Sequence, residues 1–255
     1  MDLGLSGKRA FIGGGAGGIG GGIAGVLAAE GARLVLVGRT AATLEARAAE
    51  LGAGICVSDL ATTEGPAAAV AGAVSQLGGL DLLVVNSGGP PPGTFEALGE
   101  DEWEHAIAGT LQSTLRLIRA ALPHLRKGSD PAIVINLSSS VREPLPGLTT
   151  SNVLRPGLAG LIKNLAFEIV PIRINGVAPG RFDTARVEQL DGKRAEASGA
   201  SIEEVRHEAE VRIPLGRYGD PAEIGRVAAF LLSPAASYVT GAIVPVDGGL
   251  VRALP

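Results

Sequence analysis

The sequence predicts one α/β domain in which a doubly wound parallel sheet carries helices on both faces. Three observations carry this prediction: a length of 255 residues, short apolar runs that alternate with longer helical patterns, and a glycine-rich turn after the first run. A chain of this length fits one doubly wound unit. No linker divides it, so we expect a single domain over residues 1–255.

Short apolar runs predict five strands. Each is rich in Val, Ile or Leu and lacks the alternation of apolar and polar residues, which is typical of strands buried on both faces of a parallel sheet. The predicted strands are residues 9–13, 33–37, 54–57, 80–85 and 132–137.

Longer segments with apolar residues three and four apart lie between and after these strands and predict helices. The predicted helices are residues 19–30, 41–51, 64–77, 100–125 and 151–169. Right-handed connections between parallel strands then place helices on both faces of the sheet, and the ligand lies at the carboxyl ends of the strands. Residues 183–212 are charged and helical in pattern, and we interpret them as a mobile lid over the substrate.

The composition excludes several classes of function. The net charge is −4, with acidic and basic residues interspersed, so we expect neither nucleic acid nor a membrane surface as a partner. Cys56 is the only cysteine, and the three histidines show no ligand spacing, so we expect no disulfide and no metal site. A small-molecule substrate remains.

An uncharged run at residues 10–29 superficially resembles a signal or membrane segment. Nearly half of it is glycine, so it is only weakly apolar, and a phosphate-binding turn explains it better. We therefore expect a cytoplasmic protein.

The glycine-rich turn follows the first predicted strand and leads into a helix. Glycine permits a tight turn and close approach of backbone N–H groups to a pyrophosphate, and the helix N-terminus adds partial positive charge. In this context the turn predicts a Rossmann-type dinucleotide site rather than a merely structural turn, although two glycine registers fit. The residues concerned are Gly14, Gly15, Ala16, Gly17, Gly18, Ile19 and Gly20.

The end of the second strand indicates which dinucleotide is bound. An NAD-specific site carries an Asp or Glu there, but this chain has Gly38 followed by Arg39. A guanidinium suits a 2′-phosphate, which favours NADPH, with NADH as the alternative. A solvated cation at the start of a helix is the alternative role for Arg39.

Further motifs extend over nearly the whole chain. They are Asp59-Leu60, residues 86–89 (Asn-Ser-Gly-Gly), residues 136–139 (Asn-Leu-Ser-Ser), Pro179-Gly180 with Thr184, residues 239–241 and residues 247–249. With the glycine turn they resemble the short-chain dehydrogenase/reductase family. The resemblance implies that Asp59 bonds the adenine, that Asn86 and Gly88 lie beside the cofactor, and that Pro179, Gly180 and Thr184 contact the nicotinamide end. It also implies a homodimer or homotetramer.

The catalytic residues of that family are Asn, Ser, Tyr and Lys, and here the pattern departs from it. Alignment puts Ser151 at the tyrosine, Arg155 at the lysine and Thr110 at the asparagine. One serine survives, as Ser139 or Ser138. Tyr218 and Tyr238 lie outside the matching motifs.

The chemistry of these replacements limits what remains. A serine hydroxyl is shorter and far less acidic than a phenol, so we predict that Ser151 is the N-cap of its helix rather than an acid. The very high pKa of arginine prevents a proton relay, so Arg155 is predicted to clamp the nicotinamide ribose, with a structural arginine as the alternative. Ser138 or Ser139 can polarise a carbonyl or simply form a turn.

Three functions follow from these residues. The favoured one is an NADPH-dependent ketoreductase whose proton comes from the substrate or from water, acting on a phenol-bearing ketone of an aromatic polyketide. The departures resemble those of ketoreductases from angucyclinone antibiotic pathways such as that of simocyclinone. The alternatives are a 3-oxoacyl-thioester reductase, which needs a protein acid, and a non-catalytic NADPH-binding protein.

Overall fold

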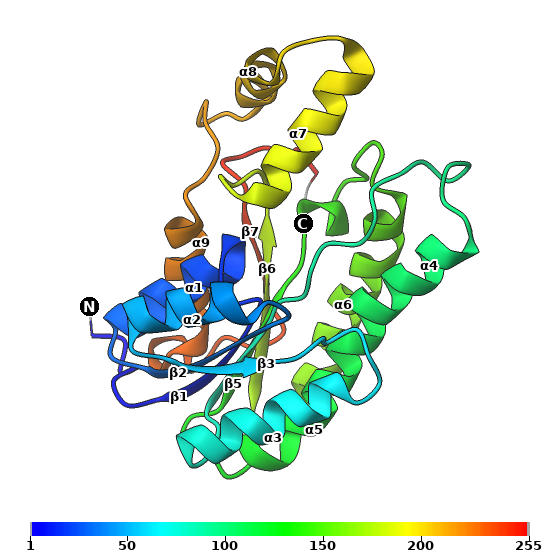
Figure 1. Ribbon diagram of the computed structural model, residues 1–255. Helices are drawn as coiled ribbons and strands as arrows, with labels where there is room; N and C mark the ends of the chain where they lie inside the picture. Colours follow the sequence, from blue (N-terminus) through cyan, green and yellow to red (C-terminus); the bar gives the residue numbers. More distant parts are fainter. Residues whose placement is uncertain (1, 254–255) are drawn as a thin grey trace.

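Seven parallel strands form the centre of the molecule (Figure 1). The computed structural model describes residues 2–253. The sheet has the order β3-β2-β1-β4-β5-β6-β7, so the strand order reverses between β1 and β4. A crevice at such a reversal is where open α/β sheets bind ligands. The strands are β1 Arg9–Gly13, β2 Arg33–Gly38, β3 Gly54–Val57, β4 Leu82–Val85, β5 Ala132–Asn136, β6 Arg173–Pro179 and β7 Ile243–Val246.

Helices cover both faces of the sheet, as the sequence predicts. Neighbouring residues of a strand point to opposite faces, so Phe11 and Ile12 of β1 belong to two different cores. The Phe11 core contains α3 Gly65–Leu77, α5 Ser113–Leu125 and α6 Thr149–Glu168. The Ile12 core contains α1 Gly18–Ala29, α2 Ala41–Leu51 and α9 Pro221–Leu232. The fold prediction is confirmed.

Two details of the prediction need correction. The fourth strand begins at Leu82 rather than residue 80, because Asp81 turns its carboxylate to Arg9. The helix predicted over 100–125 consists of α4 Glu100–Ala106, a π-helical turn Ile107–Gln112 and α5. Next to the π-turn, the hydroxyls of Ser113 and Thr114 bond the carbonyls four residues earlier, which distorts a helix.

The prediction that Ser151 caps its helix is wrong. α6 begins at Thr149, two residues earlier, with Leu148 in the cap position. The Oγ1 of Thr150 donates to the Pro91 carbonyl at 2.8 Å, and Leu148 pairs with Gly93 in an isolated β-bridge. These contacts with the loop after β4 fix the start of α6, so Ser151 lies inside the helix and is buried.

The segment predicted as a lid forms two helices, α7 Ala185–Ser198 and α8 Ile202–Arg212. Figure 1 shows them projecting beyond the carboxyl ends of the strands. Thr184 caps α7 through its side chain, and Ser201 and Glu204 form a capping box on α8. Among residues 2–253, no helix combines the length and apolar character that crossing a membrane requires.

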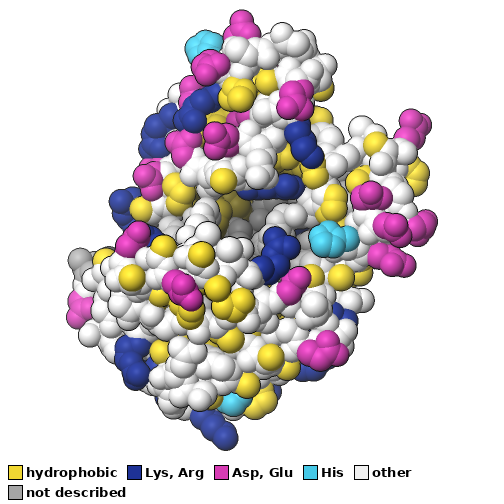
Figure 2. Space-filling model, viewed as in Figure 1, with side chains coloured by type: hydrophobic (Ala, Val, Ile, Leu, Met, Phe, Trp, Pro, Cys, Tyr) yellow, Lys and Arg dark blue, Asp and Glu magenta, His cyan; other side chains and the backbone are white. Residues whose placement is uncertain are grey.

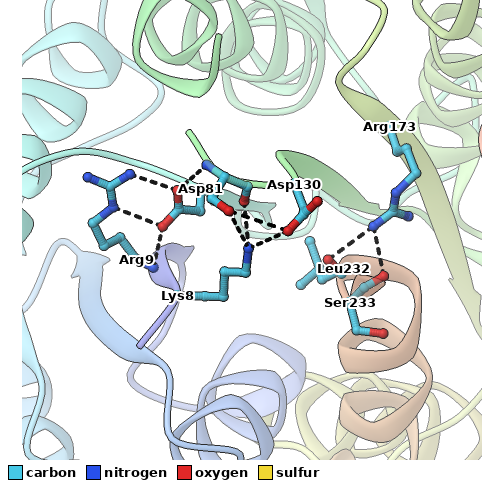
Figure 3. A network of polar contacts seen from close by, with 8 residues as sticks. Lys8, Arg9, Asp81, Asp130, Arg173, Leu232 and Ser233 are labelled. Atoms are coloured by element: carbon cyan, nitrogen blue, oxygen red, sulfur yellow. Dashed lines mark hydrogen bonds and ion pairs between the residues drawn. The ribbon is translucent and has the colours of Figure 1, made fainter. Parts of the chain in front are cut away.

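Ion pairs gather at the opposite, amino end of the sheet (Figure 3). Asp81 accepts hydrogen bonds from the backbone, Nε and Nη2 of Arg9 at 2.7–2.9 Å and from the Ser129 N–H at 2.8 Å. Its side chain is 4% exposed, whereas Asp130, paired with Lys8, is 61% exposed. Burial alone raises the pKa of Asp81, but the bonds from Arg9 and Ser129 outweigh it and hold the pKa at about 2.

We expect Asp81→Asn to lower the free energy of unfolding by about 2 kcal/mol at pH 7, because it leaves Arg9 without its buried partner. A carboxylate with a lowered pKa stabilises the fold above its unfolded pKa of 3.8, and this contribution is lost as the pH falls toward 2. Urea unfolding at several pH values measures both effects. Asp130→Asn is the exposed control and should change stability by less than about 1 kcal/mol. The role given to the Asp81 carboxylate is contradicted if the free energies of unfolding of wild type and Asp81→Asn still differ as much at pH 2 as at pH 7.

Candidate active site

A cavity of about 310 Å³ lies at the carboxyl ends of β1 to β4. Figure 2 shows a hollow on this side of the molecule, between the lid above and the helices beneath it. Several residues predicted to bind the cofactor line the cavity. They are Gly14, Ala16, Arg39, Asp59, Leu60, Asn86 and Gly88.

The glycine turn has a backbone that only glycine permits at several positions. Gly14 and Gly18 have φ of 59° and 53°, a backbone conformation that favours glycine. A Cβ on Gly20 would collide with the Gly14 carbonyl, so only glycine permits this approach. Gly17 precedes α1 and contributes no side-chain cap, so the N-terminus of α1 can receive an anion.

The cavity wall at the end of β2 carries an exposed cation. Arg39 follows β2 and is exposed, and no acid stands beside it at the end of that strand. The Oδ1 of Asp59 accepts from the Ala61 N–H at 3.0 Å, which holds the carboxylate at the cavity wall. The end of β2 therefore presents a guanidinium, which suits a phosphate, and no carboxylate.

A polar chain connects the glycine turn with the fifth strand. The Nδ2 of Asn136 donates to the Oδ1 of Asn86 at 2.8 Å, and the Nδ2 of Asn86 donates to the Gly13 carbonyl at 3.0 Å. Asn86 thus lies beside the turn, as the resemblance implies. Asn136 was not among the predicted site residues, although its position at the end of a strand adjacent to β4 could have indicated this contact.

The three serines after β5 have different roles. The Oγ of Ser138 accepts from the Ser140 N–H at 3.1 Å and caps the short 3-10 turn Ser139–Val141. The hydroxyls of Ser140 and Ser151 lie 3.0 Å apart and are both buried. Ser139 makes no side-chain hydrogen bond within the described chain. Of the two candidates, Ser139 therefore has the hydroxyl without a partner in the described chain, although it is 4% exposed and lines neither cavity.

Arg155 is buried beneath this serine turn. Its Nη1 donates to the Asn136 carbonyl at 2.6 Å, and within residues 2–253 its Nε has no partner. Burial, together with the nearby cation Arg186, lowers the pKa of Arg155 to about 10. Burial therefore corrects the sequence-based expectation of a very high pKa, and at neutral pH the guanidinium is still protonated and cannot act as a base there.

Thr110, at the position of the family asparagine, lies in the π-helical turn. It is 1% exposed, and its Oγ1 has no hydrogen-bond partner among the described residues. Thr110 also lines the cavity, so its hydroxyl is a polar group in the cavity wall. Irregular helical turns of this kind occur often at functional sites.

Tyr218 lies at the base of the lid. Its hydroxyl donates to the Oδ2 of Asp191 at 2.7 Å and accepts from the Nη1 of Arg181 at 2.9 Å. Burial and the bond to Asp191 raise the pKa of Tyr218 to about 12. Tyr238 is fully exposed. Neither hydroxyl occupies the place of the missing acid.

A second cavity, of about 500 Å³, lies between α7 and α8, with Tyr218 at its wall. Thr184 lines it, while the serine turn and Arg155 do not. Thr184 also approaches the glycine turn, since a Cβ on Gly18 would lie 3.6 Å from its Cγ2. Pro179 is the last residue of β6, and Gly180 follows it. Gly180 lies against Asp247, because a Cβ on Gly180 would collide with that residue. The described residues hold no group of three His, Cys, Asp or Glu suited to a metal.

Comparison with known proteins gives consistent relatives. A family model described as Enoyl-(Acyl carrier protein) reductase matches residues 14–251. An uncharacterized oxidoreductase of Mycobacterium tuberculosis is 34% identical over 253 residues, covering 96% of this chain and 93% of that protein.

Two solved structures are also similar. L-sorbose reductase from Gluconobacter frateurii, solved with NADPH and L-sorbose, has a TM-score of 0.94 at 31% identity and full coverage of both chains. An actinorhodin polyketide ketoreductase solved with NADPH has a TM-score of 0.91 at 27% identity, covering 96% of this chain and 98% of that one.

Proposed function

Because the chain belongs to the short-chain dehydrogenase/reductase family of oxidoreductases, we propose that it reduces a ketone with NADPH. The glycine turn, the N-terminus of α1 and Arg39 would hold the dinucleotide, and two similar structures contain NADPH. When bound, NADPH supplies the hydride. The residues of this chain bind and orient the reactants and stabilise the oxygen that becomes negative.

The observation that carries the proposal is the environment of Ser151. Its hydroxyl is buried and lies 3.0 Å from that of Ser140, so at the tyrosine position no acid reaches the cavity. Arg155 is not part of the cavity wall and donates to the Asn136 carbonyl instead, and Ser139 offers only a hydroxyl. The protein therefore polarises the carbonyl through Ser139 without protonating it.

The proton then comes from the substrate or from water, and a substrate that carries its own donor needs no acid from the protein. A polycyclic aromatic polyketide with a phenol beside the ketone is such a substrate, because the phenolic proton already bonds the carbonyl oxygen. The similar actinorhodin polyketide ketoreductase supports this class of substrate. The alternative, a 3-oxoacyl-thioester reductase, is favoured by the description of the matching family model. An aliphatic thioester, however, brings no acid.

We expect purified protein to oxidise NADPH with phenol-bearing polycyclic ketones and not with 3-oxoacyl thioesters. The same ketones with the phenol methylated are the matched controls, and their rate should fall at least about 100-fold because the internal proton is absent. Turnover of thioesters would support the alternative reductase. Tight NADPH binding without turnover of any ketone would indicate a non-catalytic protein.

The proposal includes self-association as a homodimer or homotetramer. Val153 and Phe167 of α6 are 56% and 83% exposed, and Tyr238 near the C-terminus is fully exposed. Large apolar side chains left in water favour burial against another copy.

A further inference from the structure

Arg186 occupies a position that sequence analysis did not select. It lies in the first turn of α7, where it is half-buried, and its Nη2 donates to the Pro90 carbonyl at 2.8 Å. A Cβ on Gly89 would lie 3.2 Å from its Nε, so the guanidinium rests directly against the glycine backbone. The lid therefore contacts the loop after β4 through this side chain.

Arg186 and Arg155 are two cations that no acid compensates among the described residues. Burial and the charge of Arg186 both lower the pKa of Arg155, and burial also lowers the pKa of Arg186. Among the described residues, neither guanidinium forms a salt bridge, whereas Arg206 of the lid pairs with Asp183 and Glu210. A partly desolvated cation without an acid is costly in free energy, and an anion bound beside it would offset that cost. Arg186 is placed for such an anion, because the Gly89 and Pro90 that it contacts line the first cavity.

The loop that Arg186 contacts leads to the reacting end of the site. After Pro90, the Pro91 carbonyl accepts from the Oγ1 of Thr150, the residue before Ser151. Further along, the Gly93 N–H donates to Gly147 at 2.7 Å. The loop is thus bonded to the start of α6, where relatives carry their tyrosine. Thr184, two residues before Arg186, approaches the glycine turn at Gly18.

We propose that Arg186 binds the anionic oxygen that forms on the substrate, namely the phenolate left when the neighbouring phenol gives up its proton. This inference rests on the proposed function. The carbonyl carbon accepts the hydride of NADPH, which becomes NADP⁺, and the carbonyl oxygen takes the phenolic proton to give the alcohol. The phenolate then faces Arg186 and Arg155 until it regains a proton from water.

The test uses a hydroxyanthraquinone, whose visible absorption changes when its phenol ionises. Bound to the full-length protein with NADP⁺, the probe should show a phenol pKa at least about one unit lower than in water. In Arg186→Gln the ionisation constant of the bound probe should be about tenfold lower than in wild type, so that its pKa returns toward the value in water. In Arg186→Lys part of the lowered pKa should be retained. Gly89→Ala should act in the same direction as Arg186→Gln, because its methyl group displaces the guanidinium.

Arg206→Gln is the control, because that lid arginine is already paired with acids. The inference is overturned if the probe does not bind, or if its pKa is the same in wild type and Arg186→Gln. It is also overturned if Arg186→Gln weakens NADPH binding more than about tenfold without changing the probe, because Arg186 would then bind the cofactor diphosphate. Reduction of ketones without a shifted phenol pKa would reject this inference alone. A shifted pKa without any reduction would reject the proposed function alone.

Discussion

Arg155→Met is expected to lower kcat/KM at least about 100-fold while changing the free energy of unfolding of the ligand-free protein by less than about 1 kcal/mol. The two effects differ because the charge of Arg155 serves the ligands more than the fold. The guanidinium makes one hydrogen bond, to the Asn136 carbonyl, and lies near the like charge of Arg186. Its removal loses that bond but also removes an unpaired buried cation, and the two contributions nearly cancel.

Turnover suffers because the same charge is proposed to hold the nicotinamide ribose and to stabilise negative oxygen beside it. A displacement of about 1 Å at the reacting end costs about 100-fold in rate. Single-turnover oxidation of NADPH and urea unfolding without ligand measure the two quantities on the same samples. Arg155→Lys is the matched control: it keeps the charge and should retain more activity than Arg155→Met. If the free energy of unfolding of Arg155→Met fell by more than about 3 kcal/mol, Arg155 would be a structural residue. If kcat/KM were unchanged, Arg155 would not belong to the active site.

The fold could be predicted from the sequence because strands buried on both faces leave continuous apolar runs. The first predicted strand has the observed bounds, since the register of β1 with β2 and β4 buries every residue from Ala10 to Gly13. The third also has the observed bounds, although β3 is an edge strand and only partly buried, because its short apolar run is bounded by polar residues and glycine. The start of β4 could not be found in this way. There a buried carboxylate follows Leu80, and its partner Arg9 is 72 residues away.

The site was only partly predictable, for a related reason. The glycine turn is a local backbone requirement, so its residues can be read from the chain. The role of Ser151 depends on Ser140, on the preceding Thr150 and on the distant Pro91, so local capping rules gave the wrong helix start. Arg186 has no local pattern at all, because its partner Pro90 is 96 residues earlier.

Arg39→Ala should raise the Kd of NADPH about 100-fold and leave the Kd of NADH within about threefold. The reason is that a guanidinium makes two charge-assisted bonds to a 2′-phosphate, together worth about 3 kcal/mol, and NADH has no such phosphate. Arg39 is exposed and its side chain makes no hydrogen bond to the described protein, so the substitution should leave the fold unchanged. Fluorescence titration of each dinucleotide measures both constants.

Lys127→Ala provides a charge-matched control, because Lys127 is exposed beyond the end of α5 and near the amino ends of the strands. It should leave both dissociation constants unchanged, which separates a local contact from a change in net charge. If Arg39→Ala raised the Kd of NADPH and the Kd of NADH by the same factor, Arg39 would contact the adenosine but would not bind its 2′-phosphate. The preference for NADPH would then need another origin, because no other cation flanks the carboxyl end of β2 on the described cavity wall.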